Sequence, residues 1–319
     1  MVQCHAGGFG GVLFPGGDAG PVLAEQLRCG FFATPSDRLA AGCTSDTQEA
    51  DYKDYTTYFF AALSGHTRTG QQLAPPDYDH DGRVSMAEAH AYVELTSDTI
   101  DLPVCTSDVL LRQFSKTKDD RLTGLVITAD FDGLLNRATP DRRAVLEGLA
   151  HQLGLEANAD KVAAARTMAD SIDRQRRQLE GPQRRGGGGR GGNRDRPVER
   201  DVLRDQIRAR VLARWPEMSN AYHPEAVAAL TKDADEIVRT IESHPAFKRW
   251  DELVKLAGDR EDQSFELERK WIKCQRFIYT AETVALEANL NRFATRLVQE
   301  KYKAVRAAEN ATFGKPPAK

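Results

Sequence analysis

The stretch VQCHAGGFG, residues 2–10, places a cysteine immediately before a glycine-rich segment. A cysteine at a strand end that is followed by small residues can sit on a tight turn with its sulfur exposed. The N–H groups of such a turn can stabilise an oxyanion, and a nucleophilic cysteine also needs a base that generates the thiolate. Cys4 is therefore a candidate nucleophile. The short motif leaves one alternative open, an ordinary buried cysteine beside a glycine turn.

Strand, helix and loop patterns alternate beyond this segment. Residues 30–34, GFFAT, predict a short buried strand. Residues 55–63, YTTYFFAAL, predict a helix with aromatic and apolar side chains on one face. This alternation indicates an α/β sheet domain, which we place at residues 1–130.

Four segments, in their order and spacing, resemble caspase-like (clan CD) cysteine peptidases, a group that includes metacaspases and legumain-like enzymes. Residues 4–8, CHAGG, resemble the nucleophile motif of this family. Residues 29–37, CGFFATPSD, resemble the next core strand and the segment that lines the substrate pocket. Residues 52–65 resemble the following helix, and residues 77–93 resemble an aspartate-rich segment of bacterial members. The resemblance covers residues 1–115.

The resemblance implies a partial caspase-haemoglobinase-like α/β sheet with helices. It also implies that the Cys4 thiolate hydrolyses a peptide bond in a peptide or protein substrate. In that family the catalytic histidine lies on a strand before the nucleophile, and only three residues precede Cys4 here. We therefore expect an N-terminally truncated chain that lacks the general base and is inactive as given. The alternative is a non-enzymatic pseudo-peptidase whose helical half is a scaffold or an oligomerisation module.

Histidines within the matched region do not stand at the family's catalytic position. His5 is a poor substitute base, because neighbouring side chains on an extended strand point to opposite faces. His66, His80 and His90 are expected on the surface.

Substrate preference is left open by the residues near the nucleophile. Relatives carry an acidic residue or Gln two positions before the cysteine, where this chain has Val2. Asp37 is a candidate for pocket charge toward a basic P1 residue, and a turn or capping residue is the alternative.

Residues 77–88, DYDHDGRVSMAE, fit the twelve-residue calcium loop at every key position. Gly82 stands at the sharp turn, and the ligand positions are filled by Asp77, Asp79, Asp81, the carbonyl of Arg83, Ser85 and Glu88. Pro75 and Pro76 exclude an ordinary entering helix, so we expect a single loop–helix site with Ca²⁺ as a structural cofactor. The alternative is a metal-free loop whose aspartates cap the exit helix.

The remainder of the chain is expected to be helical on both sides of a flexible segment. A helical segment is placed at residues 139–180, and residues 181–197, rich in Arg and Gly, predict a flexible linker. Apolar residues at spacings of three and four predict a helical bundle or coiled-coil region over residues 198–319. The coiled-coil alternative implies a homo-oligomer formed through these C-terminal helices.

Composition narrows the class of partner. Hydrophobic residues make up 40% and charged residues 29%, which is a soluble globular composition. The net charge of −3 argues against nucleic acid as a partner. No apolar run approaches the ~20 residues that span a bilayer, and no signal peptide is visible, so the chain as given is expected in the cytoplasm. Five cysteines without a CxxC argue against a zinc ribbon and a disulfide framework.

Overall fold

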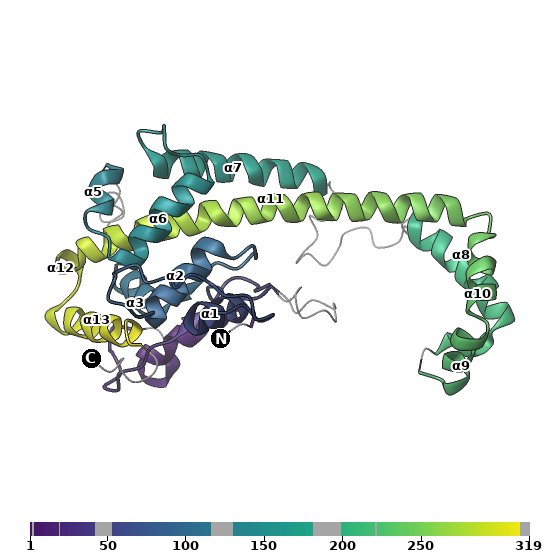
Figure 1. The fold of residues 1–319 in the computed structure, drawn as a ribbon, viewed down its shortest axis with the longest axis horizontal. Coiled ribbons are helices and arrows are strands. Elements are labelled where there is room, and N and C mark those ends of the chain that lie inside the picture. The colour runs from purple at the N-terminus through teal and green to yellow at the C-terminus, as the bar shows by residue number, and fades with distance from the viewer. Residues whose placement is uncertain are drawn as a thin grey trace. The chain divides into compact units, whose positions relative to one another are not determined.

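Helices dominate the computed structural model of this protein (Figure 1). The structure describes residues 1, 3–18, 20–41, 53–115, 130–180, 199–220 and 222–312. Within those ranges the strands are β1 (Phe31–Phe32) and β2 (Val104–Cys105), which pair antiparallel with Phe31 opposite Cys105. The expected helical character is confirmed, whereas the sheet of the described residues has two strands. The linker expected at 181–197 lies outside the described residues.

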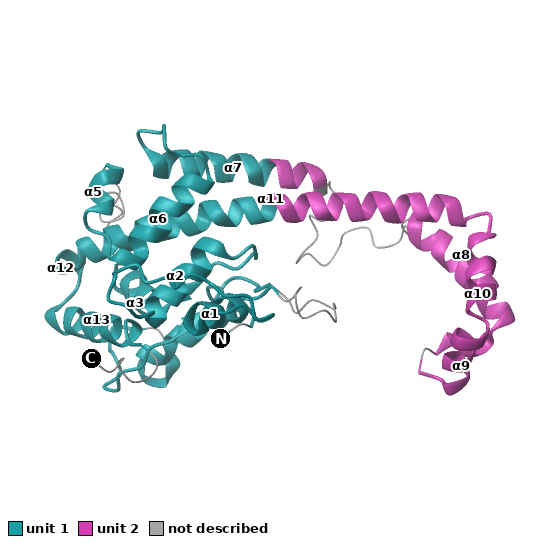
Figure 2. Cartoon of the chain, in the orientation of Figure 1, with its two compact units in different colours: residues 1–174, 268–319 teal, residues 175–267 magenta. Residues whose placement is uncertain are grey.

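The chain divides into two compact units (Figure 2). Unit 1 contains residues 1–174 and 268–319, and unit 2 contains residues 175–267. This grouping differs from the expected helical region at 198–319, because residues 268–319 belong with the N-terminal part of the chain. The physical reason is burial: Phe277 and Val305, both from this segment, are fully enclosed in the core of unit 1.

Unit 1 consists mainly of helices around the small sheet. Two 3-10 helices, η1 (Ala6–Leu13) and η2 (Pro15–Gly17), follow Cys4. The α-helices are α1 (Tyr55–Ser64), α2 (Met86–Thr96), α3 (Thr106–Ser115), α5 (Phe131–Leu135), α6 (Pro140–Gln152), α12 (Leu290–Phe293) and α13 (Arg296–Glu309). Two long helices, α7 (Lys161–Glu180) and α11 (Phe247–Ala288), begin in one unit and end in the other.

Local sequence explains where α1 and α2 begin. Asp54 caps α1, and its carboxylate accepts a hydrogen bond of 2.7 Å from the N–H of Thr57. Ser85 and Glu88 form a reciprocal capping box at the start of α2. The two helices pack against each other, with Tyr55 and Phe59 buried in a shared apolar cluster. The helix expected at 55–63 is confirmed, whereas the strand expected at 30–34 is limited to Phe31–Phe32.

Arg276 on α11 ties the chain that follows α2 to the core of unit 1. Its side chain is 0% exposed. The guanidinium donates at 2.8–3.1 Å to four backbone carbonyls, which belong to Glu94, Ser97, Thr99 and Asp101. A fifth hydrogen bond, of 3.3 Å, reaches the hydroxyl of Thr99. The backbone carbonyls of residues 94–101 thus receive from one side chain the hydrogen bonds that a helix or strand would otherwise supply.

Unit 2 contains three shorter helices, α8 (Glu199–Arg214), α9 (Pro224–Lys232) and α10 (Ala234–Glu242). Their apolar faces meet at Trp215, which packs with Val211 and Ile237. The Trp215 indole N–H donates to Asp233 at 3.2 Å. Asp233 also lies between α9 and α10. The apolar residues spaced by three and four between residues 227 and 241 therefore belong to two helices. No helix in the described part of the chain is long and apolar enough to cross a membrane.

Candidate functional site

Cys4 lies on an exposed turn that is hydrogen-bonded to the turn at residues 34–38. The His5 N–H donates to the carbonyl of Arg38 at 2.9 Å, and the Gly7 N–H donates to that of Thr34 at 2.7 Å. The His5 ring adds a third contact, of 2.8 Å from Nδ1 to the carbonyl of Ser36. The thiol of Cys4 is exposed, as the sequence suggested for a nucleophile.

Gly7 is needed for this close approach. A Cβ atom built on Gly7 would lie 2.7 Å from Cα of Pro35 and 2.8 Å from the carbonyl oxygen of Thr34. Backbone atoms cannot yield as a flexible side chain can, so any larger residue would force the two turns apart. A Cβ atom built on Gly8, by contrast, would make only an ordinary contact, 3.9 Å from Cβ of Ser36.

The segment before Cys4 runs beside β1. The amino group of Met1 donates to the carbonyl of Phe31, and the N–H of Ala33 donates to the carbonyl of Met1, both at 2.9 Å. These two bonds flank Phe32 in the pattern of a parallel pair of strands. The N-terminal residue therefore has strand-like pairing.

Asp37 lies on the neighbouring turn and is exposed. The next residue, Arg38, packs over the ring of Trp271 on α11, 4.8 Å from the ring centroid. It also lies 3.9 Å from the carboxylate of Glu268. The structure therefore brings the Asp37 turn to the Cys4 turn and supports it from the side of α11.

His5 adopts a left-handed conformation with φ of 60°. The alternation rule for strands, which argued against His5 as a base, does not apply to a residue in this conformation. Because a carbonyl only accepts, its contact with Ser36 places the ring proton on Nδ1 and leaves Nε2 with a lone pair. His66 and His80 are exposed as expected, whereas His90 is buried, so the surface expectation for His90 is wrong.

The aspartate-rich loop forms the turns expected of a calcium loop. The Gly82 N–H donates to Asp77 at 2.9 Å, that of Asp81 donates to Asp79 at 3.1 Å, and that of Arg83 donates to Asp81 at 2.8 Å. Gly82 has φ of 85°, as the sharp turn requires. Side-chain oxygens of Asp77, Asp79 and Glu88 lie within 4.8 Å of one another.

Glu88 connects the two ends of this loop. Its Oε1 accepts from the N–H of Tyr78 at 2.7 Å, and its Oε2 accepts from the N–H of Ser85 at 2.8 Å. Ser85 caps the exit helix, so the aspartates do not serve as its cap. Three of the six predicted ligands converge, and Asp81, Arg83 and Ser85 shape the loop.

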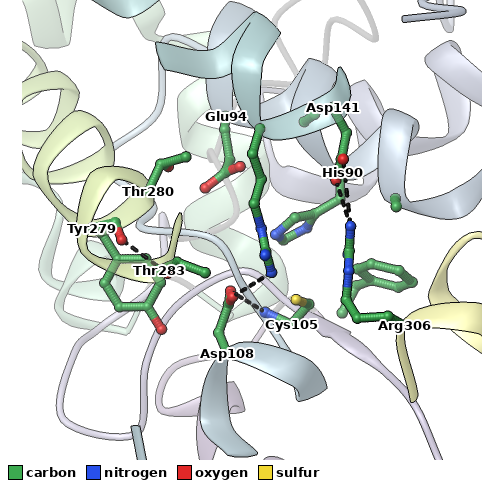
Figure 3. Close-up of a pocket in the computed structure, with 13 residues that line it drawn as sticks. His90, Glu94, Cys105, Asp108, Asp141, Tyr279, Thr280, Thr283 and Arg306 are labelled. Carbon is green, nitrogen blue, oxygen red and sulfur yellow. Dashed lines mark hydrogen bonds and ion pairs between the residues drawn. The ribbon is translucent and has the colours of Figure 1, made fainter. Parts of the chain in front are cut away.

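A small cavity in unit 1 gathers polar groups that lie far apart in the sequence (Figure 3). It measures about 20 Å³, and its polar walls include His90, Glu94, Cys105, Asp108, Asp141, Arg142 and Arg306. The ligand atoms of His90, Cys105 and Asp108 lie within 4.8 Å of one another. Sequence reasoning missed this cluster, because no local motif links a mid-helix histidine to the β2–α3 junction.

Two arginines neutralise the carboxylates around the cavity. Arg142 lies 3.3 Å from Asp108 and also pairs with Glu287. Arg306 on α13 lies 3.1 Å from Asp141 and 3.2 Å from Glu309. Glu309 also accepts a 2.8 Å hydrogen bond from the N–H of Ser107, which lies far away in the sequence. Buried ion pairs of this kind are costly to separate, because removing one partner leaves an unpaired charge.

Burial and charge shift several pKa values in this cluster. Burial lowers the pKa of His90 to about 4 and raises that of Glu94 to about 8, where the charge of Asp108 adds to the effect. Burial also raises the pKa of the Cys105 thiol well above its usual value. Burial alone would raise the pKa of Asp108, but the charge of Arg142 and further partners outweigh it and lower that pKa.

Unit 1 thus contains three groups of candidate functional side chains: an exposed thiol on a turn, an oxygen-rich loop and a buried cluster of nitrogen, sulfur and oxygen atoms. Comparison with known proteins finds no matching family model, no significantly similar curated protein and no significantly similar solved structure.

Proposed function

We propose that this chain carries the nucleophile segment of a caspase-like cysteine endopeptidase, with Cys4 as the attacking thiolate. One observation supports it most directly: three hydrogen bonds join the exposed Cys4 turn to residues 34–38. The sequence resemblance assigns that second turn to the substrate pocket. The thiolate would attack the peptide carbonyl, release the amine and leave an acyl-enzyme that water hydrolyses.

The oxyanion of this reaction requires an N–H donor beside the sulfur. Within the described part of the chain, no hydrogen bond uses the N–H of Cys4. This N–H is therefore available to donate a hydrogen bond to the oxyanion, which is the role that the resemblance implies. Asp37, on the adjacent turn, is the proposed source of pocket charge for a basic P1 residue.

A general base must accompany the thiol. The resemblance places that base on a strand N-terminal to the cysteine, and the caspase-like sheet belongs to the same proposal. His5 is the local alternative, because its Nε2 carries the lone pair while Nδ1 is held by Ser36.

Labelling by a peptidyl acyloxymethyl ketone tests the assignment of Cys4. Labelling is measured on this chain and on any longer natural form of it. We expect Cys4 to be labelled in the form that contains the general base, and we expect that labelling to be lost in Cys4→Ser. Cys29→Ser is the matched control, because Cys29 is also an exposed free thiol. Labelling that survives Cys4→Ser would contradict the proposal. So would failure of the peptidyl probe on every form while iodoacetamide still modifies Cys4.

We also propose Ca²⁺ as a structural cofactor of residues 77–88. Calorimetry should show binding by the full chain, weakened at least about tenfold in Glu88→Gln, since this change removes the charged carboxylate at the twelfth loop position. Asp98→Asn is the control, because Asp98 lies outside the loop and pairs with Lys273. Equal calcium affinity in wild type and Glu88→Gln would show that the ion binds elsewhere.

A second candidate function is a helical oligomerisation module in a pseudo-peptidase. Unit 2 contains an apolar groove of about 300 Å³, whose walls include Ile207, Leu212, Met218 and Trp250. Val227 and Leu230 on α9 are also about half exposed, at 54% and 50%. Such exposed apolar surface marks interaction sites. The occupant that we propose is a second copy of this chain.

Light scattering after size exclusion tests this second candidate. We expect a dimer that Leu212→Glu converts to a monomer, because the charge would be desolvated within the groove. Leu297→Glu, at an exposed position of unit 1, should leave the dimer intact. A wild-type monomer at all concentrations would remove the oligomerisation reading without affecting the role of Cys4.

A further inference from the structure

We propose that His90, Cys105 and Asp108 form a binding site for a single zinc ion. The three side chains come from different elements: His90 from the middle of α2, Cys105 from the end of β2 and Asp108 from the first turn of α3. Figure 3 shows them around the same small cavity. The site is separate from the oxygen-rich loop at residues 77–88.

The spacing of the three side chains suits a tetrahedral ion. Their ligand atoms lie within 4.8 Å of one another. Zinc bonds of about 2.0–2.3 Å require ligand atoms that are roughly 3.5 Å apart. The ligand atoms are therefore at most about 1.3 Å farther apart than a tetrahedral zinc ion requires.

The second observation is an unpartnered nitrogen that lines the cavity. His90 is 6% exposed, and its Nε2 is buried without a hydrogen-bond partner. A buried polar atom without a partner is unfavourable, and a metal ion would supply the missing contact. The other ring nitrogen, Nδ1, lies 2.7 Å from the hydroxyl of Tyr55. When Nδ1 donates to that oxygen, Nε2 presents its lone pair to the metal, as in other sites where a neighbour orients the ligating histidine.

Cavity size limits the occupant to an ion or a water molecule. A cavity of about 20 Å³ holds roughly one water-sized particle, so an organic ligand does not fit. Around the cavity Asp108 pairs with Arg142 and Asp141 pairs with Arg306, and Glu94 also lies in its wall. When a metal binds, the Cys105 thiol loses its proton, and the thiolate adds one more negative charge to the cavity wall. This additional charge favours a divalent cation. Arg142 also forms an ion pair with Glu287, so its positive charge is partly neutralised by a carboxylate other than Asp108.

The donor atoms select the kind of metal. One sulfur, one imidazole nitrogen and one carboxylate oxygen match zinc, whereas calcium and magnesium prefer sites made of oxygen alone. Three protein ligands leave the fourth position to a water molecule. The ion would join α2, β2 and α3 and so brace the strand pair that lies beside the Cys4 turn.

Cobalt substitution tests this proposal without relying on catalytic activity. The full chain is freed of metal with a chelator and titrated with Co²⁺, while zinc retained after dialysis is measured separately. We expect about one zinc ion per chain and a near-ultraviolet thiolate-to-cobalt charge-transfer band. Cys105→Ser should abolish the band and weaken metal binding at least about tenfold, and His90→Gln should weaken it as well.

Two matched variants exclude other sources of the signal. Cys274→Ser removes another buried free cysteine and should leave the band unchanged. Glu88→Gln removes an oxygen ligand of the aspartate-rich loop, which cannot produce a thiolate band. A folded wild-type chain that retains no zinc and shows no band would overturn the proposal and assign a buried water to the cavity. A band that persists in Cys105→Ser would overturn it equally, even if His90→Gln failed to fold.

Discussion

Replacing Arg276 with methionine should destabilise unit 1 by more than about 4 kcal/mol, because buried carbonyl groups would lose their donors. The guanidinium supplies hydrogen bonds to carbonyls at four positions between residues 94 and 101. Each unpaired buried carbonyl costs about 1–3 kcal/mol. Burial lowers the pKa of Arg276 to about 10, so burying this cation is itself unfavourable, and the hydrogen bonds have to offset that cost.

Urea titration combined with hydrogen exchange of α2 and β2 measures this loss. Arg276→Lys should have an intermediate effect, because an ammonium group cannot reach all four carbonyls in the geometry of a planar guanidinium. Lys273→Ala is the matched control on the same helix, where a partly exposed ion pair with Asp98 contributes less than about 1 kcal/mol. If Arg276→Met unfolded at the same urea concentration as Lys273→Ala, the assigned role would be wrong.

Glu94→Gln should gain stability relative to wild type as the pH rises from 5 to 9. Burial raises the pKa of Glu94 from its ordinary value of 4.5 to about 8. Between these values the folded state holds a proton that the unfolded state has released, so the stability of wild type falls as the pH rises. A shift of this size corresponds to roughly 5 kcal/mol, of which about 4 kcal/mol falls between pH 5 and pH 9, and glutamine carries no titrating group.

Unfolding midpoints in urea at pH 5, 7 and 9, with a chelator present, provide this test. Other titrating groups are common to both proteins, so their contributions cancel in the difference. Glu282→Gln removes an exposed ion pair with Arg166, and its effect should stay below about 1 kcal/mol at each pH. A constant difference between Glu94→Gln and wild type from pH 5 to pH 9 would show that Glu94 ionises as an exposed carboxyl does.

Features encoded by neighbouring residues were predictable. Asp54 and the Ser85–Glu88 box place the starts of α1 and α2, because a helix cap involves residues only three positions apart. The turns of the aspartate-rich loop were predictable for the same reason, since the residues that form them lie within twelve consecutive positions. The helical segment expected at residues 139–180 contains two helices, α6 and α7, which are separated near Gly154, a residue suited to ending a helix.

Contacts between distant residues were not predictable in the same way. Periodicity identified α11 as helical, but it did not show that Arg276 would bind carbonyls some 180 residues earlier in the chain. It likewise assigned α13 to a separate helical region, whereas Glu309 bonds to Ser107 across 202 residues. A buried arginine and a surface arginine occupy the same kind of position in a helical pattern, so the sequence alone does not distinguish them.

The sequence by itself determined the helices beyond residue 139, a turn at Cys4 and the aspartate-rich loop, because short-range geometry and hydrogen bonding specify each of them. Only the tertiary structure placed residues 268–319 in unit 1 and brought Thr34–Arg38 to the Cys4 turn. It alone collected His90, Cys105 and Asp108 around one cavity. The physical reason is that burial, ion pairing and pKa shifts depend on which distant segments pack together and exclude water. A local sequence pattern does not specify which distant segments pack together.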